Sequence, residues 1–165
     1  MKKIKLFDPF TNESEKNAIK QIFDSHFWAS GEGVGKVQKF EEKFSKYTSS
    51  KSCVAVNSGT AALNLALSMC NIKNKEVIIP SLSFVSTANA VIENGGIPKF
   101  VDIDKNTLCM DPEKILKVIS KKTKIILPVH FGGLTSNLGE ISKLCKENKI
   151  SLVEDAAHAA GSLHQ

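Results

Sequence analysis

Asp155 ends the apolar run of residues 151–154, and its position implies chemistry more clearly than that of any other residue. Open α/β sheets bind ligands beyond the carboxyl ends of their strands, so a carboxylate there would face a ligand. At ~4 Å and an effective dielectric constant of 20, it would attract a protonated ring nitrogen by roughly 4 kcal/mol, or about three pKa units. Asp155 could therefore keep a pyridine ring protonated at neutral pH, whereas its ordinary structural role would be to cap a helix.

A second candidate site lies where Ser58, Gly59 and Thr60 separate an apolar run from a helical pattern. Small residues with hydroxyls at a helix N-terminus suit a phosphate, because free backbone N–H groups and the helix dipole point toward it. The structural alternative is that Ser58 is an ordinary N-cap. Because parallel strands end at one edge of a sheet, residues 57–60 and Asp155 should share a rim. Pyridoxal 5′-phosphate (PLP) has both the phosphate and the basic ring nitrogen that these residues would bind.

Three further side chains are predicted at the same rim. His158 lies three residues after Asp155, in the first turn of an expected helix, and could hydrogen-bond a ring oxygen of the cofactor. Phe84 follows a strand end and could stack on a planar ring, although most phenylalanines are core residues. His130 also follows a strand, and it is a candidate for contact with the substrate.

Two other sequence patterns suggest a metal site and a dinucleotide-binding turn, but neither pattern meets the requirements of that kind of site. Asp102 and Asp104 resemble a paired-carboxylate or metal site, but the residues that follow predict a turn with solvated acids, and we expect no metal. Gly31, Gly33 and Gly35 have the spacing G-x-G-x-G and follow no strand pattern, so they do not make a dinucleotide-binding turn.

Alternating strand and helix patterns must hold the site residues in place. From residue 53 onward, short β-branched or aliphatic runs recur between helical patterns, which is typical of βαβ units with a parallel sheet. Strands are expected near residues 53–56, 77–79, 99–103, 124–129 and 151–154, and helices near 60–70, 84–94, 112–120 and 137–148. Upstream helices are expected over 13–27 and 36–47. The predicted fold class is α/β, with an N-terminal arm over 1–52 and a cofactor-binding large domain over 53–165.

The composition favours a globular protein of the cytoplasm. The chain has 165 residues, of which 42% are hydrophobic, enough for one domain with a real core. No apolar run approaches membrane-spanning length and no signal peptide pattern follows Met1, so we expect no membrane partner. The net charge is +5, but every basic residue is lysine and acids are interleaved, which favours solvated faces over nucleic-acid binding. The 4 cysteines are widely spaced and predict buried thiols.

Ordered motifs make the chain resemble one known family, the DegT/DnrJ/EryC1/StrS sugar aminotransferases, over nearly its whole length. The motifs lie at residues 28–31, 40–41, 58–63, 80–89 and 154–158. The resemblance implies part of the large domain of a fold type I PLP-dependent transferase, with a mainly parallel sheet flanked by helices. It implies that Gly59, Thr60 and nearby hydroxyls bind the cofactor phosphate and that Phe84 stacks on the pyridine ring. Asp155 would then pair with the ring nitrogen, and His158 would contact the ring oxygen.

The resemblance also implies an activity and a departure from the family pattern. Members usually transfer an amino group, commonly from glutamate, to a keto group of a nucleotide-linked sugar, and a neighbouring subunit of the homodimer completes each active site. The family's Schiff-base lysine lies downstream of the motif that contains Asp155. The only lysine close after a strand end, Lys105, belongs to an acidic turn. We therefore expect this chain to lack the catalytic lysine, the rest of the large domain and the small domain, and to be inactive and poorly stable by itself.

Two alternatives remain open. A related PLP-dependent sugar dehydratase carries histidine in place of the Schiff-base lysine, and the residue beyond Gln165 would discriminate between the two enzymes. A non-catalytic binding or regulatory module would keep the fold and the affinity for the cofactor without turning over a substrate.

Overall fold

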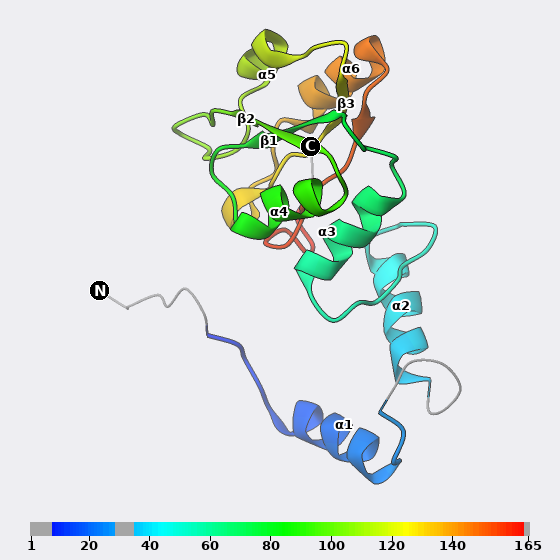
Figure 1. The fold of residues 1–165 in the computed structure, drawn as a ribbon. Coiled ribbons are helices and arrows are strands. Elements are labelled where there is room, and N and C mark those ends of the chain that lie inside the picture. The colour runs from blue at the N-terminus through cyan, green and yellow to red at the C-terminus, as the bar shows by residue number, and fades with distance from the viewer. Residues whose placement is uncertain (1–7, 29–34, 164–165) are drawn as a thin grey trace. The chain divides into compact units, whose positions relative to one another are not determined.

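The computed structural model describes residues 8–28 and 35–163. Its internal contacts divide the chain into two compact units, residues 1–55 and residues 56–165 (Figure 1). Gly31 and Gly33 of the glycine-rich stretch, and most of the first family motif, lie outside the described residues. No helix in the described ranges is long and apolar enough to span a membrane.

The first unit contains two helices, as predicted. Helix α1 (Glu13–Asp24) begins with a capping box, in which the Asn12 side chain accepts from the backbone of Glu15 and the Glu15 side chain accepts from the Asn12 N–H. Helix α2 (Lys36–Tyr47) begins after Gly35, whose φ of 62° lies in the left-handed region that glycine tolerates.

The second unit is built around a parallel sheet of four strands. The strands are β1 (Glu76–Pro80), β2 (Ile97–Val101), β3 (Thr123–Ile126) and β4 (Ser151–Leu152), in the spatial order β2-β1-β3-β4. The helical elements are α3 (Gly59–Ser68), α4 (Val85–Glu93), α5 (Pro112–Val118), the short 3₁₀ helix η1 (Phe131–Gly133) and α6 (Leu138–Asn148). From β1 the chain first moves to β2 on one side and then to β3 on the other, so the strand order reverses between β1 and β3. In such sheets, ligands bind at this switch point, beyond the carboxyl ends of the strands.

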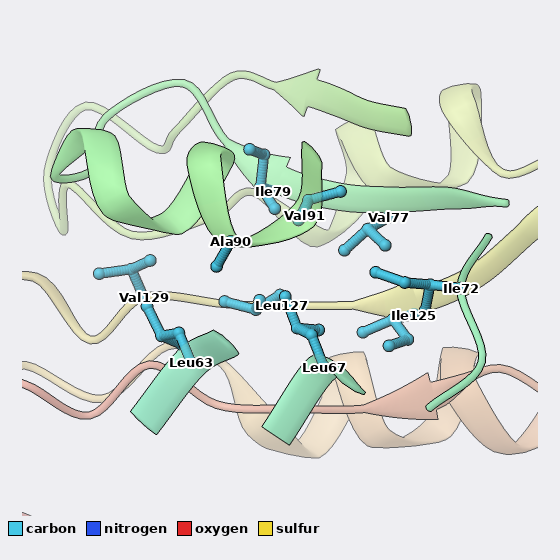
Figure 2. Packing of buried hydrophobic residues seen from close by; sticks show 10 residues of the cluster. All are labelled: Leu63, Leu67, Ile72, Val77, Ile79, Ala90, Val91, Ile125, Leu127 and Val129. Carbon is cyan, nitrogen blue, oxygen red and sulfur yellow. The ribbon is translucent and has the colours of Figure 1, made fainter. Parts of the chain in front are cut away.

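Apolar side chains cover both faces of the sheet. Val77 and Ile79 of β1 belong to one cluster on one face of the sheet, together with Leu63 and Leu67 of α3 (Figure 2). Ile78, between them, belongs to a second cluster on the other face with residues of α5 and α6. This two-sided burial explains why β1 carries a continuous apolar run, residues 77–79, rather than an alternating pattern.

The expected strand at residues 53–56 does not form in the described structure, which is a correction to the sequence prediction. A strand needs a neighbour to accept and donate its ladder hydrogen bonds, and no described strand pairs with this run. Val54 and Val56 consequently remain 68% and 41% exposed. The strand expected at 124–129 also ends early, at Ile126, shortly before Pro128, which has no N–H to donate.

The acidic turn at Asp104 forms as predicted. Its Oδ1 accepts the backbone N–H groups of Asn106 at 3.0 Å and Thr107 at 2.9 Å. The bond from Thr107 is the main cause of a lowered pKa for this carboxyl group. Within the described residues, no three His, Cys, Asp or Glu side chains are grouped so that they could hold a metal ion.

Candidate functional site

A pocket of about 420 Å³ opens at the carboxyl edge of the sheet. Its lining comes from the start of α3, from the segment between β1 and α4, from η1 and from the turn after β4. The lining residues are Gly59, Thr60, Leu63, Ser83, Phe84, Ser86, Phe131, Asp155, Ala157 and His158. The pocket therefore gathers five of the seven residues predicted at the rim, while Ser58 and His130 lie outside its lining.

The N-terminus of α3 lines part of the pocket. Ser58 is the N-cap of α3, and its Oγ accepts the N–H of Ala61 at 3.2 Å. This is the ordinary capping role that the sequence offered as the alternative to phosphate binding. The N–H groups of Gly59 and Thr60 stand in the first turn, where the helix offers them no acceptor. A Cβ atom added to Gly59 would meet no other atom within 4 Å. This helix end consequently presents backbone donors to open space.

Asp155 also lines the pocket and is only 9% exposed. Its Oδ1 accepts the N–H of Ala157 at 3.2 Å, and its Oδ2 accepts the hydroxyl of Thr87 at 3.0 Å. Its backbone N–H donates to the Pro128 carbonyl at 2.9 Å, which fixes the residue at the strand edge. No cationic side chain of the described residues lies within ion-pair distance of this carboxylate. A largely buried carboxylate without a cation is costly, so the site favours a cationic ligand.

His158 lines the same pocket, but it lies on a turn and not on the predicted helix. The helix expected after Asp155 does not form, and residues 156–161 make turns instead. The Asp155 carboxylate accepts the N–H two residues ahead, and this local bond competes with a helix. His158 Nδ1 accepts the N–H of Gly132 at 3.2 Å, so the proton of a neutral ring must lie on Nε2. The ring of Phe131 meets the His158 ring edge-on at 5.8 Å between centroids.

Phe84 is the N-cap residue of α4 and is 74% exposed. It is therefore not a core residue of the described structure, which was the alternative to a stacking role. An aromatic side chain normally contributes most when its faces are covered. Phe84 lines the pocket, and its ring is therefore available to stack on a planar ligand.

His130 is 3% exposed, so its side chain is buried, and it is not among the residues that line the pocket. Its Nδ1 accepts the N–H of Ser136 at 3.1 Å, so the ring proton lies on Nε2, 3.0 Å from Glu154 Oε2. The backbone N–H of His130 also donates to the Asp155 carbonyl at 3.2 Å. These bonds connect the segment after β3 to the segment after β4, and substrate contact by His130 stays a prediction.

Sequence reasoning missed two hydroxyl residues at the site, Ser83 and Thr87. Thr87 is fully buried and contacts the Asp155 carboxylate, although 68 positions separate the two residues. The available signal was its helical spacing with Ala90 and Val91, which put a hydroxyl on the core-facing side of α4. That spacing does not reveal which residue the hydroxyl meets.

The chain is similar to known proteins in both sequence and structure. The model of the DegT/DnrJ/EryC1/StrS aminotransferase family matches residues 9–165. The chain is 40% identical over 152 residues to the spore coat polysaccharide biosynthesis protein SpsC of Bacillus subtilis strain 168. This match covers 92% of the present chain but 38% of SpsC, so the chain spans about two fifths of the length of that relative.

Solved structures of longer proteins also match most of the present chain. The chain superposes on 3-amino-5-hydroxybenzoic acid synthase with a TM-score of 0.88 and 32% identity, over 93% of this chain and 40% of that one. It superposes on GDP-4-keto-6-deoxymannose-3-dehydratase, solved with a trapped PLP-glutamate geminal diamine, with a TM-score of 0.87 and 32% identity. The second match covers 95% of this chain and 42% of the dehydratase.

Proposed function

The chain belongs to the DegT/DnrJ/EryC1/StrS aminotransferase family, and on this premise we propose that its pocket holds PLP for the transfer of an amino group to a sugar. The observation that carries the proposal is the Asp155 carboxylate, which lines the pocket, is nearly buried and has no cationic partner among the described residues. A protonated pyridine nitrogen would supply the missing positive charge.

The N-terminus of α3, which lines the same pocket, suits the cofactor phosphate. The free N–H groups of Gly59 and Thr60 and the positive end of the α3 dipole would bind it. The open space in front of Gly59 leaves room for the phosphate oxygens. Ser58 would contribute indirectly, because its Oγ caps the helix and so holds these two N–H groups in place.

The ring and its substituents would meet Phe84 and His158, which line the same pocket. The exposed ring of Phe84 would stack on the pyridine. Because Gly132 donates to His158 Nδ1, the Nε2–H group would be the donor to the ring oxygen. The chain therefore offers donors to each anionic or oxygen-bearing part of the cofactor and an acceptor to its nitrogen.

The proposed reaction takes the amino group of glutamate and transfers it to the keto group of a nucleotide-linked sugar, giving 2-oxoglutarate and an amino sugar. When bound, PLP would supply a protonated ring that acts as an electron sink for the negative charge that develops at the carbon bearing the amino group. The residues described here would bind and orient the ring and hold its nitrogen protonated. The proposal includes a homodimer, as the family resemblance implies, and a location in the cytoplasm, as the sequence predicts.

The test uses the whole protein, purified from its native source and loaded with PLP, because the present chain spans about two fifths of the length of SpsC and the family's Schiff-base lysine is expected downstream of the motif that contains Asp155. It is mixed with [¹⁵N]glutamate and a nucleotide-linked keto sugar, and the products are weighed by mass spectrometry. We expect 2-oxoglutarate and a sugar that carries ¹⁵N. Bound PLP that glutamate never converts to pyridoxamine phosphate (PMP) would contradict the proposal and support the non-catalytic module.

A sugar dehydratase is the second candidate, because one closely superposing structure is an enzyme of that kind. The same experiment separates the two. A dehydratase would return a sugar that has lost a hydroxyl group and contains no ¹⁵N, whereas an aminotransferase would retain the label.

A further inference from the structure

Thr87 occupies the third position of α4, and its hydroxyl lies directly behind the Asp155 carboxylate. We propose that Thr87 is a positioning residue which, together with Ser83, holds this carboxylate in the orientation that receives the ring nitrogen of the cofactor. The inference rests on the proposed function, because it assigns a role in the same pocket.

Two anchors hold the carboxylate. Ala157 N–H donates to Oδ1 at 3.2 Å from the turn after β4, and Thr87 Oγ1 donates to Oδ2 at 3.0 Å from α4. One hydrogen bond would leave the carboxylate plane free to rotate about its Cβ–Cγ bond. Two bonds, one on each oxygen, fix that plane while leaving each oxygen a further lone pair for a ligand.

The direction of the hydroxyl protons follows from the chemistry of the groups. Ser83 Oγ and Thr87 Oγ1 lie 2.6 Å apart, and either could donate to the other. An ionised carboxylate can only accept, so the Thr87 proton must point to Asp155. Ser83 must then donate to Thr87. The result is a directed chain from Ser83 through Thr87 to Asp155, in which each bond polarises the next.

The Thr87 hydroxyl is not needed to build its own helix. Helix α4 has no side-chain cap at its N-cap residue, Phe84, and the backbone N–H of Thr87 donates to the Phe84 carbonyl at 3.1 Å. Its side-chain partners are Ser83 and Asp155, and the residue is fully buried. A valine would fill the same space but leave Oδ2 without its donor.

The experiment compares T87V with T87S, which restores the hydroxyl. The probe is PMP labelled with ¹⁵N in its ring, because PMP lacks the aldehyde that would react with surface lysines. T123V is the matched control, since Thr123 Oγ1 also donates to a carboxylate, that of Glu76, at 3.2 Å, but at the amino edge of the sheet. Affinity is measured by calorimetry, and the ring ¹⁵N shift reports whether the nitrogen is protonated.

We expect T87V to weaken PMP binding about 10-fold, the scale of one hydrogen bond to a charged group, and to move the ¹⁵N signal toward the unprotonated ring. T87S should restore both values, and T123V should change neither. Affinity and ¹⁵N shift unchanged in T87V would overturn the proposal. A T123V variant with the same losses as T87V would also overturn it, because the effect would then be one of general stability.

A cofactor-free measurement separates this inference from the proposed function. If the unsubstituted protein binds no PMP, the proposed function fails, and crystal structures of the cofactor-free variants decide the role of Thr87. A rotated Asp155 carboxylate in T87V but not in T87S would support positioning by the hydroxyl. An unrotated carboxylate in T87V would overturn it.

Discussion

Replacing Asp155 with asparagine removes the negative charge of the pocket and reverses one hydrogen bond, because the amide NH₂ would donate to Thr87 Oγ1 where Oδ2 now accepts from it. The side chain keeps its size, and its oxygen can still accept the Ala157 N–H. Because the carboxylate is 9% exposed and has no cationic partner within the described chain, its removal should not destabilise the cofactor-free protein. We therefore expect D155N to fold and to unfold at the same urea concentration as the unsubstituted protein, or a higher one.

The loss should appear when PMP binds. At ~4 Å, a carboxylate and a pyridinium attract each other by roughly 4 kcal/mol at a dielectric constant of 20 and by roughly 1 kcal/mol in bulk water. Asp155 is nearly buried, but the pocket opens to solvent, so we take about 2 kcal/mol, equivalent to about 30-fold in Kd.

Calorimetric titration with two ligands checks this estimate. One ligand is PMP, and the other is its analogue with C–H in place of the ring nitrogen. PMP is preferable to PLP because all 22 basic residues of the chain are lysines, with which an aldehyde would react. The analogue should bind the unsubstituted protein about 30-fold more weakly than PMP, as expected from the same 2 kcal/mol, whereas D155N should bind the two ligands nearly equally. Equal affinity of the unsubstituted protein for both ligands would refute the assignment of Asp155.

Three other predictions test the rest of the molecule. G59A should stabilise the protein by about 0.5 kcal/mol in urea unfolding but weaken PMP binding about 10-fold, because the new Cβ enters the space left for the phosphate; unchanged affinity would place the phosphate elsewhere. The pKa of Glu76 is lowered from its ordinary 4.5, first by the Ser120 hydroxyl, so its carboxylate stabilises the fold above that pH and loses this effect as pH falls through the lowered value. E76Q should therefore lower Tm by about 4 °C at pH 7 and by progressively less below pH 4.5, and a deficit that persists in acid would contradict this role. Burial raises the pKa of the Cys145 thiol above its ordinary 9.0, so this residue and the buried Cys109 should resist a thiol reagent until unfolding, while Cys53 and Cys70 react, as peptide mapping would show.

Local signals predicted much of the fold. Asp111 followed by Pro112 indicated the start of α5, and the structure has Asp111 as its N-cap with Pro112 in the first turn. The bounds of α2 match the predicted 36–47. The family and the α/β fold class are also confirmed, because ordered motifs and the strand–helix alternation are both readable without contacts.

Features that depend on distant partners could not be predicted in this way. The apolar run at 53–56 has the composition of a strand, but strand formation depends on a neighbour that no local pattern reveals. The turns after Asp155 depend on a side-chain bond to Ala157 that competes with the helix predicted there. The contact between Thr87 and Asp155 spans 68 positions and depends on how α4 packs on the sheet.

The hydrogen-bonding polarity of the pocket is nevertheless set by groups that can act only as donors or only as acceptors. Backbone N–H groups can only donate, so Gly132 makes His158 Nδ1 an acceptor and leaves Nε2–H as the donor for a ligand. An ionised carboxylate can only accept, so Asp155 directs the protons of Thr87 and Ser83 toward itself. The first turn of α3 adds donors to the same pocket. A ligand with an anionic group, a cationic ring nitrogen and an acceptor oxygen satisfies all these groups at once, whereas a ligand without the cationic group leaves the Asp155 carboxylate without a positive partner in the described part of the chain.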